Sequence, residues 1–162
     1  MGDRQTHGFP SFFDSESEIL ILGSFPSVKS REEGFYYGHP QNRFYKVLSS
    51  CFNAPLPIGI EDKKAFLAKH HIALSDSIGE CLIVGSSDAS IKQAVPMDLR
   101  PIFKEGKIKK ILLNGKTAEK FFYKFQKIDK SIPCITMPST SAANAAWSLE
   151  KLIEIYKAAL LG

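Results

Sequence analysis

A loop rich in aromatic, imidazole and amide side chains follows the first apolar run of the sequence. The stretch 23–44 carries Tyr36, Tyr37, His39 and Asn42 within a few residues of one another. A flat aromatic ring can stack on a nucleobase, and an amide can read the edge of a base or hold a water molecule. These residue types therefore fit the handling of a nucleobase. The alternative is that the two tyrosines only pack the loop against the rest of the protein.

Three consecutive hydroxyl side chains precede the last helical pattern of the sequence. Ser139, Thr140 and Ser141 stand in the stretch MPSTSAAN, where we expect the C-terminal helix to begin. Hydroxyls and free backbone N–H groups at a helix N-terminus suit a phosphate group. The alternative is ordinary helix capping, which needs only one of the three hydroxyls.

Lysines are concentrated in one segment of a chain whose net charge is only +4. Residues 104–130 contain nine lysines against Glu105, Glu119 and Asp129. Such an excess of positive charge fits a face turned toward a polyanion such as DNA. A solvated lysine-rich surface is the alternative.

The cysteines and histidines argue against a metal or redox site. Cys51, Cys81 and Cys134 are scattered, odd in number and form no C-x-x-C pair, so we expect three reduced thiols, mostly buried. The four histidines show no metal-binding spacing. We therefore predict that the protein uses no metal ion and no organic cofactor.

The chain has the size and composition of one globular domain. Its 162 residues suffice for a full hydrophobic core, so we assign residues 1–162 to a single domain. No stretch approaches the ~20 apolar residues of a membrane-spanning helix, and the first residues contain no secretory leader. We expect a soluble, cytoplasmic protein that does not contact membranes.

Short apolar runs alternate with helical patterns along the chain. The alternation predicts an α/β sandwich with a parallel sheet, because strands buried on both faces read as continuous apolar runs. The predicted strands cover residues 19–22, 72–74, 111–113 and 134–137. The predicted helices cover residues 42–52, 61–70, 117–126 and 147–160.

Three polar loops follow predicted strands. In parallel sheets of this kind, ligands bind beyond the carboxyl ends of the strands. Residues 23–44, 75–91 and 137–144 all follow such ends, and the second loop contains Ser86 and Ser87 in the stretch GSSD. We therefore expect the functional site where these three loops meet.

The ordered set of loop motifs resembles the uracil-DNA glycosylase superfamily. The motifs are GSFPS at 23–27, GFYYGHPQNRFYK at 34–46, GSSD at 85–88 and PSTS at 138–141. Together they most resemble the hypoxanthine-DNA glycosylase branch, also called DNA-deoxyinosine glycosylases. The stretch 34–46 is similar also to the mismatch-specific uracil glycosylase branch. The resemblance covers the chain from His7 to the final helix.

The resemblance implies a fold, an activity and a partner. The fold would be a three-layer α/β/α sandwich with a four-stranded parallel sheet. The activity would be that of a monofunctional DNA glycosylase in base excision repair, which flips a deaminated base out of DNA and hydrolyses its N-glycosidic bond, with hypoxanthine preferred. The partner would be DNA that contains deaminated bases, and no metal or organic cofactor would be needed. The sequence leaves the oligomeric state open, and a monomer is our default expectation.

The resemblance also assigns roles to residues at the matching positions. It implies Asn42 as the catalytic residue, which would position water, and Tyr37 as the aromatic that stacks on the base. The implied base-binding residues are Gly23, Ser24, Phe25, Pro26, Tyr37 and His39. The implied DNA-binding residues are Pro138, Ser139, Thr140, Ser141, Ser86 and Ser87.

One position departs from the superfamily pattern. Many members carry Asp or Asn at the third position of the first motif, where it positions the attacking water, and here that residue is Phe25. Either catalysis has moved to Asn42, or the protein is inactive. The alternatives are a uracil or mismatch-specific uracil/thymine glycosylase, a non-catalytic binder of damaged DNA, and a small-molecule enzyme on a flavodoxin-like fold.

Overall fold

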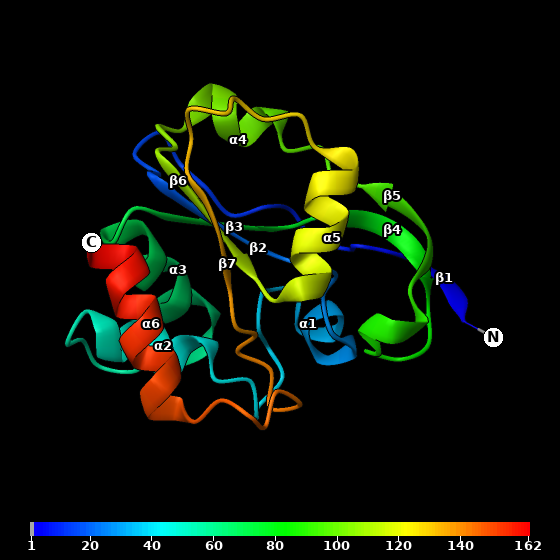
Figure 1. Cartoon of the computed structure of the whole chain (residues 1–162). Coiled ribbons are helices and arrows are strands. Elements are labelled where there is room, and N and C mark those ends of the chain that lie inside the picture. Colours follow the sequence, from blue (N-terminus) through cyan, green and yellow to red (C-terminus); the bar gives the residue numbers. More distant parts are fainter. Residues whose placement is uncertain (1) are drawn as a thin grey trace.

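Four short parallel strands form the centre of the protein, as the computed structural model of residues 2–162 shows (Figure 1). Their order across the sheet is β3-β2-β6-β7, so β2 and β6 are the two inner strands. The parallel sheet predicted from the apolar runs is confirmed. Its strands are β2 (Ile19–Gly23), β3 (Ile72–Asp76), β6 (Lys110–Asn114) and β7 (Cys134–Met137).

Helices cover both faces of this sheet, which explains why its strands are apolar on both sides. Successive side chains of a strand point to opposite faces. Ile21 and Leu112 accordingly pack into one core cluster, and Leu20 and Leu113 pack into another. The predicted three-layer sandwich is thereby confirmed. The first face carries α2 (Phe44–Cys51), α3 (Gly59–Lys69) and α6 (Leu149–Leu161), and the second carries α4 (Arg100–Glu105) and α5 (Lys116–Phe125).

The central strands run further toward their carboxyl ends than the apolar runs suggest. The β3 strand extends through Ser75 to Asp76, and β6 extends to Asn114. These polar residues stay in the ladder because the neighbouring strand pairs with them, as Gly23 does with Asp76. The extension brings polar side chains to the edge of the sheet where ligands bind.

A second, antiparallel sheet was not predicted from the sequence. Its strands are β1 (Asp3–Thr6), β4 (Ile78–Ile83) and β5 (Lys92–Pro96), in the order β1-β4-β5. The expectation that residues 75–91 form one loop is therefore wrong. Gly79 and Glu80 interrupt the apolar pattern of β4, and β1 contains no apolar residue. The two strands are therefore recognised by the hydrogen bonds between them and not by their residue composition.

The long first loop also contains a helix. The α1 helix (Val28–Glu33) begins where Ser27 Oγ accepts a hydrogen bond from the backbone N of Ser30 at 3.1 Å. It ends at Gly34, whose φ of 79° lies in the left-handed region that glycine adopts without strain. The chain between β2 and α2 therefore consists of a loop at 24–27, the short helix α1 and a second loop at 34–43.

The C-terminal helix begins later than the hydroxyl motif suggests. The α6 helix starts at Leu149, and Ser148 caps it by accepting a hydrogen bond from the backbone N of Lys151 at 3.2 Å. The expectation that Ser139, Thr140 and Ser141 stand at this helix N-terminus is therefore wrong. They belong to a loop of residues 138–148, which we call the hydroxyl loop.

The cysteines, the possible metal ligands and the lengths of the helices can be described for residues 2–162. Cys51 and Cys81 are buried, Cys134 is half-buried, and none of the three forms a disulfide. Across residues 2–162, no three His, Cys, Asp or Glu side chains gather as a metal site would require. Over the same residues, no helix combines the length and the apolar character needed to span a membrane.

The layered core makes a prediction about stability. Leu112 is fully buried, and its neighbour in register, Ile135 on the outer strand β7, is 36% exposed. We expect Leu112→Ala to lower the free energy of unfolding by about 2–5 kcal/mol, because it leaves a cavity between packed layers. Ile135→Ala should cost about 1 kcal/mol or less. Urea denaturation of both variants tests this, and equal losses would contradict the assigned layers.

Candidate active site

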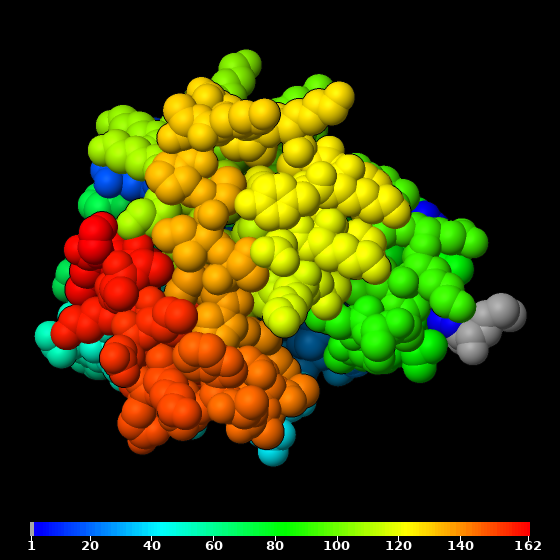
Figure 2. Space-filling view, in the orientation of Figure 1, coloured from blue at the N-terminus to red at the C-terminus, as the bar shows by residue number. Residues whose placement is uncertain are grey.

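A cavity of about 410 Å³ lies at the carboxyl ends of the central strands. Residues of the first loop, the 84–91 segment and the hydroxyl loop all contribute to its walls. In Figure 2, atoms of α1 are visible in the hollow between the start of α5, the 84–90 segment and the hydroxyl loop. The three loops therefore meet where the sequence predicts.

Most of the predicted site residues line this cavity. Pro138 and Ser87 are the exceptions: the Pro138 carbonyl accepts a hydrogen bond from Tyr156 Oη at 2.9 Å, and Ser87 is exposed on the 84–91 segment. The predicted residues in the lining are Gly23, Ser24, Phe25, Pro26, Tyr37, His39, Asn42, Ser86, Ser139, Thr140 and Ser141.

The orientation of the Asn42 amide is fixed by two donors. Its Oδ1 accepts a hydrogen bond from the backbone N of Phe44 at 2.9 Å and another from Thr140 Oγ1 at 2.9 Å. Because a backbone N–H can only donate, the oxygen rather than the nitrogen must face α2. Among residues 2–162, no hydrogen bond engages Nδ2, so the donor end of this amide is available to a water or ligand.

Asn114 extends this contact into the sheet. Its Nδ2 donates to Thr140 Oγ1 at 3.1 Å, and its Oδ1 accepts from the backbone N of Thr140 at 3.1 Å. Tyr156 Oη also reaches Asn114 Oδ1, at 3.2 Å. Asn114 was missed in the sequence, although a polar residue that ends an apolar strand is a usable signal in a fold that binds ligands there.

Arg43 fastens the hydroxyl loop to the first loop. Its guanidinium donates to the carbonyl oxygens of Ser141 at 2.9 Å, Asn144 at 3.2 Å and Trp147, with a longer contact to Thr140 O. The backbone N of Arg43 donates to Thr140 O at 3.0 Å. Two of these carbonyls also accept turn hydrogen bonds, Ser141 O from the backbone N of Asn144 at 3.0 Å and Asn144 O from that of Trp147 at 3.2 Å, and α6 begins only after these turns.

Tyr37 places an aromatic face beside the cavity. Its ring stacks on Phe44 with centroids 3.9 Å apart and an angle of 16° between the planes. Burial, reinforced by the negative charge of Asp76, raises the pKa of Tyr37 well above its usual value, so its hydroxyl stays protonated. That hydroxyl is buried and has no hydrogen-bond partner among residues 2–162.

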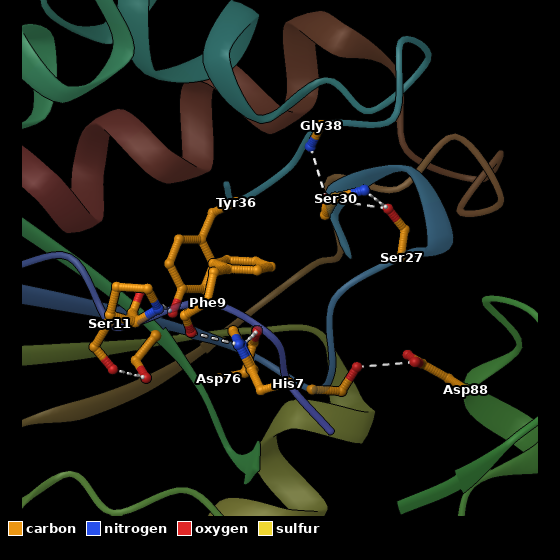
Figure 3. Close-up of polar contacts among 12 residues, drawn as sticks. His7, Phe9, Ser11, Ser27, Ser30, Tyr36, Gly38, Asp76 and Asp88 are labelled. Atoms are coloured by element: carbon orange, nitrogen blue, oxygen red, sulfur yellow. Dashed lines mark hydrogen bonds and ion pairs between the residues drawn. The ribbon is translucent and has the colours of Figure 1, made fainter. Parts of the chain in front are cut away.

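Asp76 and His7 form a buried pair behind the cavity wall. The His7 Nε2 and Asp76 Oδ2 atoms are 2.6 Å apart, and His7 Nδ1 is 2.9 Å from the carbonyl oxygen of Phe9 (Figure 3). Asp76 also lines the cavity. Neither residue was predicted. Asp76 ends a strand, as Asn114 does, but His7 lies in a segment that only the second sheet brings here.

Known proteins are similar to this chain in sequence and in fold. The family model of the uracil DNA glycosylase superfamily matches residues 10–160. A hypoxanthine DNA glycosylase of Methanosarcina barkeri is 32% identical over 121 residues, which are 70% of this chain and 73% of that protein. One of Methanosarcina acetivorans is 32% identical over 144 residues, or 87% and 89% of the two chains.

A solved structure agrees with these matches. It is the solution NMR structure of a Methanosarcina acetivorans protein whose description as a uracil DNA glycosylase is provisional. It superposes with a TM-score of 0.80 at 27% identity and covers 98% of this chain and 97% of its own. The chain belongs to the uracil DNA glycosylase superfamily. It is accordingly a DNA glycosylase, a hydrolase whose substrate is DNA.

In this glycosylase, Phe25 serves the packing of the second sheet. Its ring is 8% exposed and lies in a cluster with Ile78, Cys81 and Phe121. The Arg31 guanidinium lies 5.4 Å from the ring centroid. The position therefore offers no polar side chain to the cavity. A carboxylate comes instead from Asp88, whose Oδ1 accepts a hydrogen bond from Ser24 Oγ at 2.8 Å.

The lysines of the glycosylase do not share one face. Lys107 pairs with Glu16 at 3.1 Å and Lys110 donates to the carbonyl oxygen of Ala159 at 2.6 Å, both near the amino end of β6. The α5 lysines begin at Lys116, on the cavity side of the same strand. Lys107 and Lys110 therefore lie away from the cavity, whereas Lys116 at the start of α5 lies near it.

The clamp made by Arg43 predicts an unequal effect of two conservative changes. We expect Arg43→Lys to lower the free energy of unfolding by about 1–3 kcal/mol, because one ammonium group cannot replace a planar guanidinium that serves several carbonyls. Arg100→Lys, at an exposed pair with Asp98, should leave it almost unchanged. Chemical denaturation of both variants is the measurement, and indistinguishable midpoints would contradict the clamp.

Proposed function

We propose that the protein excises deaminated bases from DNA in base excision repair, with hypoxanthine preferred. The observation that carries the proposal is the Asn42 amide, which lines the cavity with its oxygen fixed and its nitrogen available. The two relatives named hypoxanthine DNA glycosylase support the choice of base. Asn42 is the catalytic residue of this proposal.

Binding begins with the flipping of the damaged nucleotide, which costs a few kcal/mol and less at a mispair. The base enters the cavity and stacks on the face of Tyr37 that is not covered by Phe44. The 23–26 stretch and His39 surround the base. The hydroxyl loop, with Pro138 and Ser139–Ser141, and the 84–91 segment, with Ser86 and Ser87, contact the DNA backbone.

Hydrolysis then breaks the bond between the base and deoxyribose, through a transition state with positive charge on the sugar. The Nδ2–H group of Asn42 donates a hydrogen bond to the attacking water and leaves a lone pair of that water free for the sugar. An amide is a weak base, so Asn42 contributes by positioning rather than by proton removal. Hydrogen bonds from the cavity to the departing base stabilise its developing negative charge.

We also propose that one chain is the working unit. All the walls of the cavity come from a single copy, and the superfamily match runs through residues 10–160 without interruption. The protein would therefore act as a monomer, with one glycosylase domain over residues 1–162. No step of the proposed reaction requires a metal ion or an organic cofactor.

The preferred base decides between this proposal and its nearest rival. A cavity of about 410 Å³ has room for a two-ring base, and a smaller pyrimidine held loosely would be positioned less well. We expect hypoxanthine to leave faster than uracil. The likeness to the solved structure at a TM-score of 0.80 favours uracil as the second candidate.

A panel of matched oligonucleotides measures this preference. Duplexes that differ only in inosine, uracil, xanthine, or thymine opposite guanine are incubated with excess enzyme and then cleaved with alkali. Faster release of uracil than of hypoxanthine would assign the protein to the uracil glycosylases. Retained binding with no release of any base would indicate a non-catalytic binder of damaged DNA.

Two substitutions test the role of Asn42. Asn42→Ala should reduce excision of hypoxanthine by about 100-fold or more while lesion binding persists, because the water is no longer positioned. Asn42→Asp keeps the oxygen that Phe44 and Thr140 bind but removes the N–H donor, and it should be similarly impaired. Gln5→Ala, on the distant β1 strand, is the control. Single-turnover rates close to those of the unmodified enzyme would contradict the role.

A further inference from the structure

The hydroxyl group of Thr140 is used differently from those of the two serines beside it. Thr140 is fully buried, whereas Ser139 and Ser141 are half-buried. The hydroxyl oxygens of the two serines accept hydrogen bonds from the backbone N of Ser141 at 3.1 Å and of Ala143 at 3.2 Å. Among residues 2–162, no hydrogen bond uses the hydrogens of these two hydroxyls, so both can donate to a phosphate. The Thr140 hydroxyl instead finds its partners inside the protein.

Asn114 determines the direction in which the Thr140 hydroxyl donates. The backbone N–H of Thr140 can only donate, and its nitrogen lies 3.1 Å from Asn114 Oδ1. The other end of that amide, Nδ2, therefore lies 3.1 Å from Thr140 Oγ1 and donates to it. Since the hydroxyl oxygen already accepts from Asn114, its single hydrogen is left to point toward the first loop.

That hydrogen is donated to Asn42. Thr140 Oγ1 lies 2.9 Å from Asn42 Oδ1, and the same oxygen accepts from the backbone N of Phe44, also at 2.9 Å. If the Asn42 amide were turned round, its nitrogen would face two donors, and both donors would lose their acceptor. A buried donor without an acceptor costs free energy, so the amide keeps its nitrogen toward the cavity.

The remaining polar group of Thr140 is also bound within the protein. Its carbonyl oxygen accepts a hydrogen bond from the backbone N of Arg43 at 3.0 Å. Thr140 therefore contacts β6 through Asn114 and the first loop through both Asn42 and Arg43. A residue bound on all these sides is suited to fixing the position of the Asn42 amide relative to the sheet.

We propose that Thr140 is a positioning residue for the hydrolysis: its hydroxyl, directed by Asn114, holds the Asn42 amide with its N–H group toward the attacking water. This inference rests on the proposed glycosylase function and gives Thr140 a role inside the protein. Ser139 and Ser141 remain the hydroxyls of this loop that can reach the DNA backbone. Because Thr140 acts through Asn42, its loss should slow the hydrolysis without weakening the binding of lesion-containing DNA.

Substitutions at Thr140 test this role. Single-turnover release of hypoxanthine and the dissociation constant are measured with the same inosine-containing duplex. Thr140→Val removes the hydroxyl with little change of shape, and we expect the release rate to fall by about 10-fold or more while the affinity stays nearly the same. Thr140→Ser keeps the hydroxyl and should restore most of the rate. Thr140→Ala serves in place of Thr140→Val if the added methyl group clashes with Asn114, whose nitrogen lies 3.1 Å from Oγ1.

A second background shows whether Thr140 acts through Asn42. In the Asn42→Ala enzyme, Thr140→Val should cause no further loss of rate, because the amide that it positions is absent. Thr136→Val is the matched control, since it removes a hydroxyl on β7 that donates to Glu119, and it should leave the rate unchanged in both backgrounds. Thermal unfolding of each variant checks that the fold persists.

Hydrogen exchange followed by NMR tests the orientation in the unmodified protein. The side-chain amide of Asn114 donates to the buried Thr140 hydroxyl, whereas that of Asn42 has no acceptor among residues 2–162. The amide hydrogens of Asn42 should therefore exchange with water faster than those of Asn114. The reverse order would overturn the inference, whatever the stability of the variants.

The outcomes distinguish the inference from the proposed function. If the unmodified enzyme releases no base from any lesion, the proposed function fails. If that enzyme is active and Asn42→Ala is slow, the inference fails when Thr140→Val keeps the full rate or loses the same factor in both backgrounds. Weaker DNA binding at an unchanged rate would assign Thr140 to the DNA contact. A loss of rate that requires Asn42 and that Thr140→Ser restores supports the inference.

Discussion

The site depends above all on the contact between Arg43 and the backbone of the hydroxyl loop. The guanidinium and backbone N of Arg43 bind carbonyl oxygens between Thr140 and Trp147, about a hundred residues further along the chain. Asn42 directly precedes Arg43, and Thr140 is one of the residues whose carbonyl oxygen Arg43 binds. The contact therefore sets the distance between Thr140 and Asn42. A planar group with several N–H donors is suited to this task, because it can serve carbonyls that point in different directions.

The register of the parallel sheet positions the polar strand-end residues of the site, Asp76 and Asn114. Gly23 pairs with Asp76, and β6, which ends at Asn114, lies on the other side of β2. Three consecutive strands therefore end side by side in a glycine, a carboxylate and an amide. The glycine sits between the two polar residues and leaves the space that the Asp76 and Tyr37 oxygens occupy. A shift of register by one residue would send these side chains to the opposite faces.

An element could be predicted from the sequence where its own residues carry the pattern, and could not where contacts with distant residues define it. The four central strands and the helices around them were predictable because burial on both faces requires continuous apolar runs, such as Ile19–Leu22. The β1 strand was not predictable, because its residues are polar and only its pairing with the distant strand β4 defines it. The position of Ser139–Ser141 relative to α6 was wrong for a similar reason: the intervening residues form turns whose carbonyl oxygens bind the distant Arg43, and no local pattern shows that contact. Asn42 and Tyr37 were found from a motif, whereas His7 required the second sheet.

The two parts of the site are joined by a short chain of hydrogen bonds. Asn114 lines the cavity at the end of β6, and its amide donates to Thr140, whose hydroxyl donates in turn to Asn42. Under the proposed function, a base that contacts Asn114 would therefore meet the same network that fixes the Asn42 amide. Phe25 takes no part in it, since its ring packs against the second sheet. The apolar residue at that position thus helps to hold in place the sheet that carries His7 to Asp76, while polar groups from β3, β6 and the hydroxyl loop line the cavity. Under the proposed function, binding of the base and placement of the water would depend on the same few hydrogen bonds, so a base that fits the cavity poorly would also leave the water poorly placed.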